Sequence, residues 1–304
     1  MTKEFYSNGK LLLTGEYAIL DGAKGLAVPT KYGQFLKITT NQTKKLDWKS
    51  LDNEGETWFT TSLNIDKILE GKKETSEESV DGVLFNLLRE AKKLNPNFLS
   101  GTEGFKVETK LDFPRDWGLG SSSTFINNIA QWAEVDAFQL LWNAFSGSGY
   151  DIACAQNDSP ILYQVKDKVP TVTAIDFNPK FKKSLFFIHL DKKQNSREGI
   201  AQYRKMDFDV HRLTDSITRL TLEIAKSEDL ATFETLMERH EILLAQILQT
   251  KTIKQQLFPD YPGIIKSLGA WGGDFVLATG NKHTPDYFTK KGYHTVIPYL
   301  EIVL

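Results

Sequence analysis

A Gly-Leu-Gly turn followed by three serines is the stretch of this chain best suited to bind phosphate. It consists of Gly118, Leu119, Gly120, Ser121, Ser122 and Ser123. Apolar residues recur at helical spacing from residue 122 to residue 133, so we expect the serines in the first turn of a helix. Free N–H groups and the positive end of the helix dipole would then face an anion such as phosphate. Alternatively, the segment is a glycine turn before a helix that Ser123 or Thr124 merely caps.

Three other segments place glycines beside side chains that can do chemistry. Residues 9–22 read Gly-Lys-Leu-Leu-Leu-Thr-Gly-Glu-Tyr-Ala-Ile-Leu-Asp-Gly, residues 146–153 read Ser-Gly-Ser-Gly-Tyr-Asp-Ile-Ala, and residues 269–275 read Gly-Ala-Trp-Gly-Gly-Asp-Phe. The first motif (residues 9–22), the glycine-serine loop (residues 118–123) and the third motif (residues 269–275) resemble the three motifs of the GHMP kinases. This family includes galactokinase, homoserine kinase, mevalonate kinase and phosphomevalonate kinase. The order of the motifs is the family's, they span nearly the whole chain, and the first motif and residues 146–153 most resemble the phosphomevalonate kinase branch.

The resemblance implies a fold of the α+β class with two domains. An N-terminal ATP-binding domain, residues 1–170, would be similar to domain 2 of ribosomal protein S5. A C-terminal domain, residues 171–304, would be ferredoxin-like, with the active site in the cleft between the two. ATP and Mg²⁺ are the implied cofactors, because transfer of a γ-phosphoryl group needs a cradle for the triphosphate and a metal ion to offset its charge.

The catalytic residues that the resemblance implies are Asp151 and Lys10. Asp151 would take the proton from the acceptor, and the Lys10 ammonium would keep that carboxylate ionised and balance charge on the phosphoryl group. Gly118 to Ser123 would hold the phosphates, with Ser122 as the hydroxyl on the metal side. Simpler alternatives are that Asp151 caps a short helix and that Lys10 is a surface lysine at a strand end.

The substrate-binding residues implied in the same way come from several segments and are Glu16, Ser148, Gly149, Arg197, Gly272 and Gly273. The role of Glu16 is open, since an acidic residue repels phosphate unless it orients a lysine or binds Mg²⁺. Residues 191–197, which include Lys192, Lys193 and Arg197, could hold an acceptor phosphate or form an exposed basic turn. Trp271 departs from the family pattern and either narrows the acceptor pocket or turns into the core.

Composition fits a cytoplasmic enzyme that acts on a small-molecule substrate. The chain has 304 residues, of which 40% are hydrophobic and 25% charged, with a net charge of −2, so neither nucleic acid nor an anionic membrane is an expected partner. It contains no apolar window near the ~18 residues of a membrane span and no secretory leader pattern. The lone Cys154 cannot form an internal disulfide, and no structural metal is expected. A monomer and a homodimer are equally compatible with the sequence.

Hydrophobic periodicity predicts a mixed order of strands and helices. The predicted strands are residues 10–13, 35–39, 57–61, 105–111, 161–163, 171–175, 185–190 and 274–279, with closing strands in residues 294–304. The predicted helices are residues 80–91, 122–133, 137–145, 213–224 and 233–247, and we expect His240 on the last of them to be a core or interface residue. Residues 40–49 and 70–78 are polar and are predicted to be loops.

Three functions remain open. The first is a kinase of the mevalonate pathway with phosphomevalonate, or else mevalonate, as acceptor. The second is a kinase of the same family for a sugar or amino-acid alcohol. The third is a catalytically idle nucleotide or metabolite sensor, against which the complete set of Lys10, Ser122 and Asp151 argues.

Overall fold

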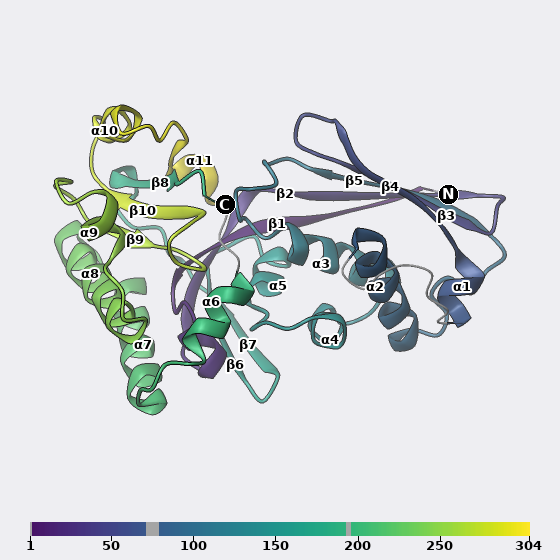
Figure 1. Ribbon diagram of the computed structural model, residues 1–304, viewed down its shortest axis with the longest axis horizontal. Helices are drawn as coiled ribbons and strands as arrows, with labels where there is room; N and C mark the ends of the chain where they lie inside the picture. Colours follow the sequence, from purple (N-terminus) through teal and green to yellow (C-terminus); the bar gives the residue numbers. More distant parts are fainter. Residues whose placement is uncertain (1, 71–78, 193–195) are drawn as a thin grey trace. The chain divides into compact units, whose positions relative to one another are not determined.

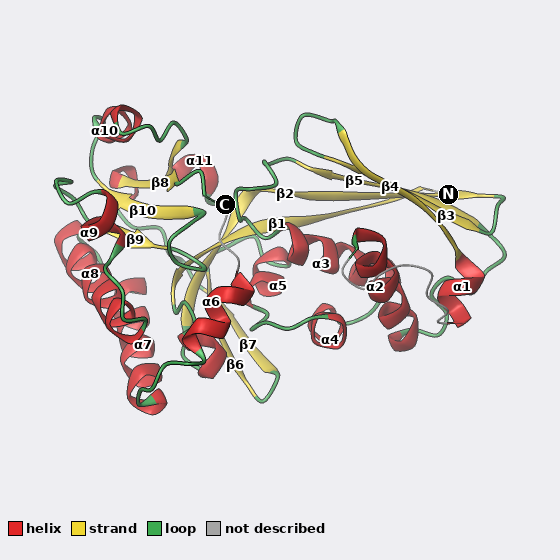
Figure 2. Ribbon diagram, in the orientation of Figure 1, coloured by secondary structure: helices red, strands yellow, loops and turns green. Residues whose placement is uncertain are grey.

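The computed structural model describes residues 2–70, 79–192 and 196–304 and has an α+β fold (Figures 1 and 2). The chain folds into two compact units. The first unit comprises Met1–Gly9, Tyr32–Arg115 and Leu119–Gln156, and the second unit comprises Lys10–Lys31, Asp116–Gly118 and Asn157–Leu304. The predicted domain boundary at residue 170 stays a prediction, and these units divide the chain at other places. No helix in the described ranges is both long and apolar enough to span a membrane.

Strands of the first unit are hydrogen-bonded in the order β4-β3-β5-β2. Strand β3 is parallel to β5, and the other two pairings are antiparallel. Side chains along β5 alternate between buried and exposed, as expected for strands with one covered face. The strands are β2 (Gly25–Asn41), β3 (Lys45–Leu51), β4 (Thr57–Asn64) and β5 (Gly104–Leu111), and β1 (Thr2–Thr14) pairs with β2.

The helices of the first unit lie on one face of these strands (Figure 1). Their apolar residues pack with those of β2, β3 and β5 in one core that includes Leu36, Trp48, Leu88 and Ile129. Asp136 caps α4 by accepting from the amides of residues 138 and 139. The helices are α1 (Ile65–Glu70), α2 (Val80–Leu94), α3 (Ser121–Ala133), α4 (Ala137–Ala144) and α5 (Tyr150–Ala155).

The loop predicted over residues 40–49 is wrong for most of its length. Strand β2 continues to Asn41, and β3 begins at Lys45. Leu46 and Trp48 are buried in the core, whereas the polar residue between them is not. Charged residues on the exposed face therefore concealed a strand with an apolar face. Of the second predicted loop, residues 71–78 lie outside the described residues.

The second unit contains a four-stranded antiparallel sheet with the order β11-β8-β10-β9. A separate hairpin of β6 and β7 pairs with the first residues of β2. These strands are β6 (Ile161–Lys166), β7 (Val169–Ala174), β8 (Leu185–His189), β9 (Ile265–Ser267), β10 (Phe275–Thr279) and β11 (Val296–Pro298).

Two long amphipathic helices, α7 and α8, pack against each other in the second unit. Asp209 and Asp229 cap them, which satisfies amide groups that a helix start leaves unpaired. The helices are α6 (Ser196–Tyr203), α7 (Val210–Ala225), α8 (Leu230–Ile247), α9 (Ile253–Leu257), α10 (Thr284–Lys290) and α11 (Tyr299–Ile302), with 3-10 turns η1 (Ala18–Asp21) and η2 (Lys182–Ser184). Of the closing strands predicted in residues 294–304, the structure has the short strand β11. The chain then turns into helix α11, for which Pro298 is the N-cap.

Candidate functional site

Helix α3 of the first unit begins at the glycine-serine loop, as its apolar spacing predicts. Gly120 is its N-cap, with a φ of 92° that favours glycine, and it offers no side chain to the first-turn amides. At this helix start Ser122 is exposed and Ser121 is half-buried, in contrast to the buried Ser123. The helix start therefore presents amide groups and serine hydroxyls, the arrangement that suits an anion.

The hydroxyls of Ser123 and Thr124 have partners inside the first unit. Ser123 Oγ donates to the Gly120 carbonyl oxygen at 2.8 Å, and Thr124 Oγ1 donates to Gln34 Oε1 at 2.7 Å. Neither residue is the N-cap, so the capping alternative for these two residues is wrong. Leu119 is fully buried. The phosphate-binding and metal-binding roles of residues 118–123 stay predictions.

Helix α5 carries Asp151 in its first turn. Its N-cap is Gly149, with a φ of 87°, and the buried Ser148 precedes it. The alternative that Asp151 caps this helix is therefore wrong. Asp151 is half-buried, and its Oδ1 accepts from the amide of Ile152 at 3.1 Å.

Helices α3 and α5 are packed side by side in the first unit (Figure 1). The Asn127 side chain in α3 accepts from Gln156 Nε2 at 2.9 Å, next to the end of α5. Two helices with glycine-capped starts thus pack in one unit, one carrying the serines and the other carrying Asp151.

In the second unit, residues of all three resembling motifs meet at Gly118. Lys10 Nζ, from the first motif, donates to the Gly118 carbonyl oxygen at 2.8 Å. The side chain of Asp274, from the third motif, occupies the space that a Cβ on Gly118 would fill, and Gly118 has a φ of 66°. Only glycine allows this close approach without strain. No contact of Asp274 is predicted from the sequence, although the residue belongs to the third motif.

The third motif forms a turn with an unusual backbone. Trp271, Gly272 and Asp274 have φ values of 54°, 85° and 51°. The Trp271 ring is buried and packs in a cluster with Tyr17, Tyr203 and Leu248. Trp271 also lines a cavity of this unit, so both alternatives stated for it stay open.

Helix α6 contacts the first motif through Gly199 and Tyr203. Arg197 lies in this helix, which begins at Ser196, so the alternative of an exposed basic turn is wrong for Arg197. Lys193 lies outside the described residues. Gly199 packs directly against the Tyr17 side chain, and the rings of Tyr17 and Tyr203 stack at 5.4 Å. Arg197 is exposed and lies two residues before this contact.

A cavity of about 350 Å³ lies among these elements of the second unit. Tyr17 of the first motif lines it, and so do Ala270, Trp271 and Gly272 of the third motif. Gly199 of α6 and Lys192, which follows β8, also line it. Its remaining walls come from the end of β8, α9 and residues before and after α9. The cavity is mixed in character, with apolar side chains, amide side chains and a cation.

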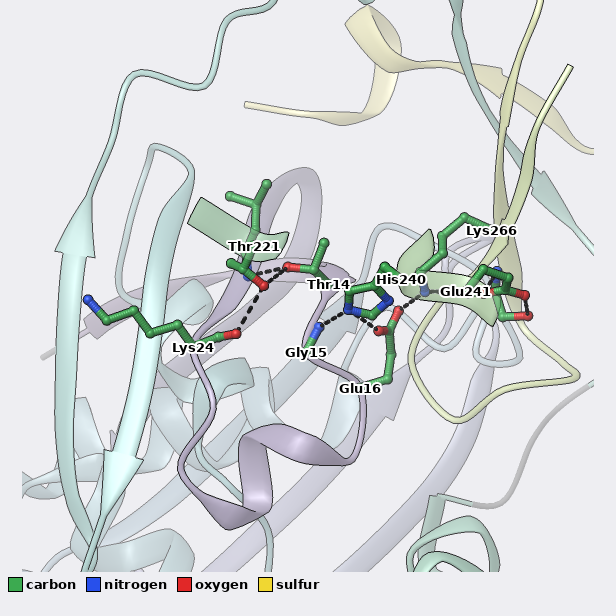
Figure 3. Close-up of polar contacts among 10 residues, drawn as sticks. Thr14, Gly15, Glu16, Lys24, Thr221, His240, Glu241 and Lys266 are labelled. Carbon is green, nitrogen blue, oxygen red and sulfur yellow. Dashed lines mark hydrogen bonds and ion pairs between the residues drawn. The ribbon is translucent and has the colours of Figure 1, made fainter. Parts of the chain in front are cut away.

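Glu16 lies in a buried cluster of charged side chains (Figure 3). Its Oε1 accepts from Lys266 Nζ at 2.5 Å, and Lys266 Nζ also lies 3.4 Å from Glu241 Oε2. All three residues are at most 3% exposed. Sequence reasoning missed Lys266, because lysine is rarely buried and nothing local marks this one.

Burial changes the protonation of this cluster. It raises the pKa of Glu16 to about 7 and raises the pKa of the Glu241 carboxyl. It also lowers the pKa of His240 well below the usual range, and the charge of Lys266 acts in the same direction. His240 is fully buried, which confirms it as a core residue, and its Nε2 accepts from the Gly15 amide at 3.0 Å. The neutral ring therefore carries its proton on Nδ1. The substrate-binding role of Glu16 stays a prediction.

Within the described residues, no group of three His, Cys, Asp or Glu side chains could hold a metal ion. Mg²⁺ needs no such group when it keeps several water molecules and binds substrate phosphates. The Ser122 hydroxyl at the start of α3 fits that manner of binding. Cys154 is free and buried.

No protein-family sequence model and no curated protein sequence matches the chain. Solved structures do match its fold along nearly the full length. Mevalonate kinase from Methanococcus jannaschii aligns with a TM-score of 0.69 at 16% identity, over 96% of this chain and 94% of that one. Phosphomevalonate kinase from Streptococcus pneumoniae, in complex with phosphomevalonate and AMPPNP, gives 0.70 at 16% identity, over 99% and 98%.

Galactokinase from Lactococcus lactis, complexed with galactose, gives a TM-score of 0.67 at 13% identity, over 95% of this chain and 88% of that one. All three proteins are members of the GHMP kinase superfamily. The resemblance carried by the motifs is thereby confirmed at the level of the fold.

Proposed function

Because the chain has the α+β fold of the GHMP kinases, we propose that it is a cytoplasmic kinase that uses ATP and Mg²⁺ to phosphorylate a small molecule. The leading acceptor is phosphomevalonate, and mevalonate is second. One observation carries the proposal: Lys10, Gly118 and Asp274, from three motifs far apart in the sequence, meet at one point. A fold alone supports many functions, whereas a meeting of motif residues is a property of a site.

The glycine-serine loop would bind the phosphates of ATP. Backbone amides at the start of α3 donate to anionic oxygens, and the helix dipole adds to the attraction. Ser122, in the first turn of that helix, would complete the shell of Mg²⁺. When bound, Mg²⁺ offsets negative charge on the transferred phosphoryl group.

Asp151 and Lys10 would act on the reacting atoms. The acceptor oxygen forms the new bond to the γ-phosphorus as the bond from that phosphorus to the β,γ-bridging oxygen breaks. Asp151 takes the proton that the acceptor oxygen loses. The positive charge of Lys10 would stabilise charge on the phosphoryl oxygens.

The cavity of the second unit is our candidate for the acceptor. It lies against the first and third motifs, and Lys192 is the cation among the described residues that line it. Arg197 lies two residues before Gly199, which also lines the cavity. An acceptor that bears a phosphate or carboxylate would be held by these cations through charge-assisted hydrogen bonds.

A phosphoryl-transfer assay tests the proposal. The purified protein is incubated with ATP, Mg²⁺ and, in separate reactions, phosphomevalonate, mevalonate, galactose and homoserine, and both ADP and phosphorylated product are measured. We expect the highest kcat/KM with phosphomevalonate. For that acceptor, Arg197→Ala should raise KM by roughly ten-fold and leave KM for ATP unchanged.

Other outcomes of this assay separate the alternatives. Preference for mevalonate, galactose or homoserine would keep the kinase and change the acceptor. ATP binding without turnover on any acceptor would contradict the kinase and favour a nucleotide sensor.

A further inference from the structure

Four consecutive residues at the end of strand β1 each bond to a different segment of the second unit. Thr14 Oγ1 and Thr221 Oγ1 of α7 lie 2.8 Å apart, and the Gly15 amide donates to His240 Nε2 of α8 at 3.0 Å. The Glu16 carboxylate accepts from Lys266 of β9, and Tyr17 Oη donates to the Ala270 carbonyl oxygen at 2.7 Å. Figure 3 shows the first three of these contacts converging on residues 14–16. The Thr14–Tyr17 turn is thus held by side chains and backbone from well beyond residue 200.

The backbone of this turn needs such support. Tyr17 has a φ of 58°, which is uncommon for a residue other than glycine. Gly15 has a φ of 95°, and a Cβ there would lie 2.8 Å from Gly25 Cα. Conformations of this kind persist only when the surroundings hold them, and they cluster at functional sites.

The Lys266 contact is an ion pair. It is fully buried, and its Nζ reaches three oxygens: Glu16 Oε1 and the Ser267 carbonyl oxygen, each at 2.5 Å, and Glu241 Oε2 at 3.4 Å. Three acceptors match the three donors of an ammonium group. Glu241 is held in turn by the amide and hydroxyl of Ser267, at 3.1 Å and 2.8 Å.

Glu16 is much less well satisfied than Lys266. Its Oε2 has no hydrogen-bond partner among the described residues, and neither has Nδ1 of His240. His240 Nε2 lies 3.7 Å from Glu16 Oε2 but already accepts from Gly15, so it cannot donate to the carboxylate. The bond to Lys266 is therefore the main polar restraint on the Glu16 side chain.

We propose that Lys266 is a positioning residue: through Glu16 it fixes the Thr14–Tyr17 turn, and thereby the end of the strand that carries Lys10. The proposal rests on the proposed function for its catalytic consequence. Lys266 touches no reacting atom and acts on Lys10 through the backbone of residues 10–16. Tyr17 and Ala270 extend the same restraint to the third motif.

The test compares Lys266→Met with the wild type by hydrogen exchange and by kinetics. Removal of one partner from a buried ion pair is strongly destabilising at the site, so amide exchange in residues 11–17 should rise at least about ten-fold. Exchange in β8 of the same unit should stay within about two-fold of the wild type, because β10 separates β8 from β9 in the sheet. The kcat for phosphoryl transfer should fall about ten-fold with KM for ATP nearly unchanged.

Two further variants make the result specific. Lys291→Met removes a surface ion pair of the same unit, with Asp260 at 2.7 Å, and should change neither exchange nor kcat. In Glu16→Gln/Lys266→Met the Glu16 carboxylate, which the single change leaves without its lysine partner, is gone, whereas Glu241 keeps its two bonds from Ser267. Exchange in residues 11–17 should therefore return part of the way. If Lys266→Met does not fold, recovery of a folded protein in the double variant supports the same coupling, and no recovery contradicts it.

Exchange that is unchanged in residues 11–17, or that rises equally in β8, would overturn the positioning role. Because exchange is read without substrate, it decides the role of Lys266 even if the protein phosphorylates none of the acceptors. Absence of activity in the wild type would instead contradict the proposed kinase.

Discussion

Lys10 Nζ donates a 2.8 Å hydrogen bond to the carbonyl oxygen of Gly118, at the entrance of the glycine-serine loop. The two residues are far apart in the sequence, and both belong to the second unit. The side chain that we propose to balance charge on the phosphoryl group is therefore anchored to the backbone that leads into the proposed phosphate cradle.

Replacement of this lysine tests its role. Lys10→Met should lower kcat by roughly 10²-fold or more and change ATP affinity only modestly, because the cation acts most strongly on charge that develops in the transition state. Steady-state kinetics and nucleotide titration give the two quantities. Lys254→Met removes a similar lysine contact to a carbonyl oxygen, that of Gly263 at 2.7 Å, and should leave kcat unchanged. Equal turnover of Lys10→Met and wild type at saturating substrate would refute the role.

Asp151→Asn should lower kcat by roughly 10²–10⁴, the range for loss of an acid/base group, with ATP affinity nearly intact. Asparagine keeps the shape of the side chain and an oxygen that can accept from the Ile152 amide. The helix start should therefore be preserved, which circular dichroism can check. A variant that retains more than about a tenth of the wild-type kcat would not be compatible with Asp151 as the base.

Ser122→Ala should increase the Mg²⁺ concentration for half-maximal rate by roughly five-fold, the equivalent of about 1 kcal/mol. Thr124→Val is the matched control, since Thr124 lies in the same helix turn outside the proposed cradle and its hydroxyl donates to Gln34 Oε1. It should lower stability and leave the Mg²⁺ dependence as in the wild type. Superimposable Mg²⁺ titrations for Ser122→Ala and wild type would assign the metal to another residue.

Gly118→Ala should lower the free energy of unfolding by about 2 kcal/mol or more, through left-handed backbone strain and overlap with a packed side chain. The new Cβ would meet the Asp274 side chain. Gly292→Ala separates the two causes, because Gly292 has a φ of 94° and no atom within 4 Å of a new Cβ. Its cost should be strain alone, about 1–2 kcal/mol. Equal losses in the two variants, measured by urea denaturation, would argue against close packing at Gly118.

Glu16→Gln should change how stability depends on pH. Glu16 has a pKa of about 7 in the folded protein, whereas an unfolded chain gives about 4.3. Between these values the folded state holds a proton that the unfolded state has lost. The stabilisation is complete below about pH 4.3 and is lost as the pH rises through about 7. Glutamine cannot titrate, so the wild type should lose roughly 2–3 kcal/mol relative to Glu16→Gln between pH 5 and pH 8.

The groups that face Glu16 are Lys266, Glu241 and His240, and all three are present in both proteins. Their own titration should largely cancel in the comparison. Urea denaturation at the two pH values measures it, and a stability difference that does not change with pH would contradict a raised pKa at Glu16.

Elements whose side chains follow a repeated local pattern could be predicted from the amino-acid sequence. Helices α2, α3, α7 and α8 follow from apolar spacing of 3.6 residues, and the glycines at 118 and 120 mark a turn before α3. The fold was predicted from the resemblance of the motifs to those of the GHMP kinases. These patterns are local, so they can be recognised without knowing which segments pack against them.

Contacts between residues far apart in the sequence could not be predicted, because they form only when the chain packs. Strand β9 has three residues, too few to show a period, and its central residue is a lysine that the sequence places on the surface by default. Lys266 can be buried because two carboxylates supply oxygens that offset its desolvation. Glu16 lies far from it in the sequence, and Glu241 lies in helix α8. The contact of Asp274 with Gly118 has the same origin. These pairings depend on how the sheet and helices of the second unit pack. The spacing of residues along one segment cannot predict them.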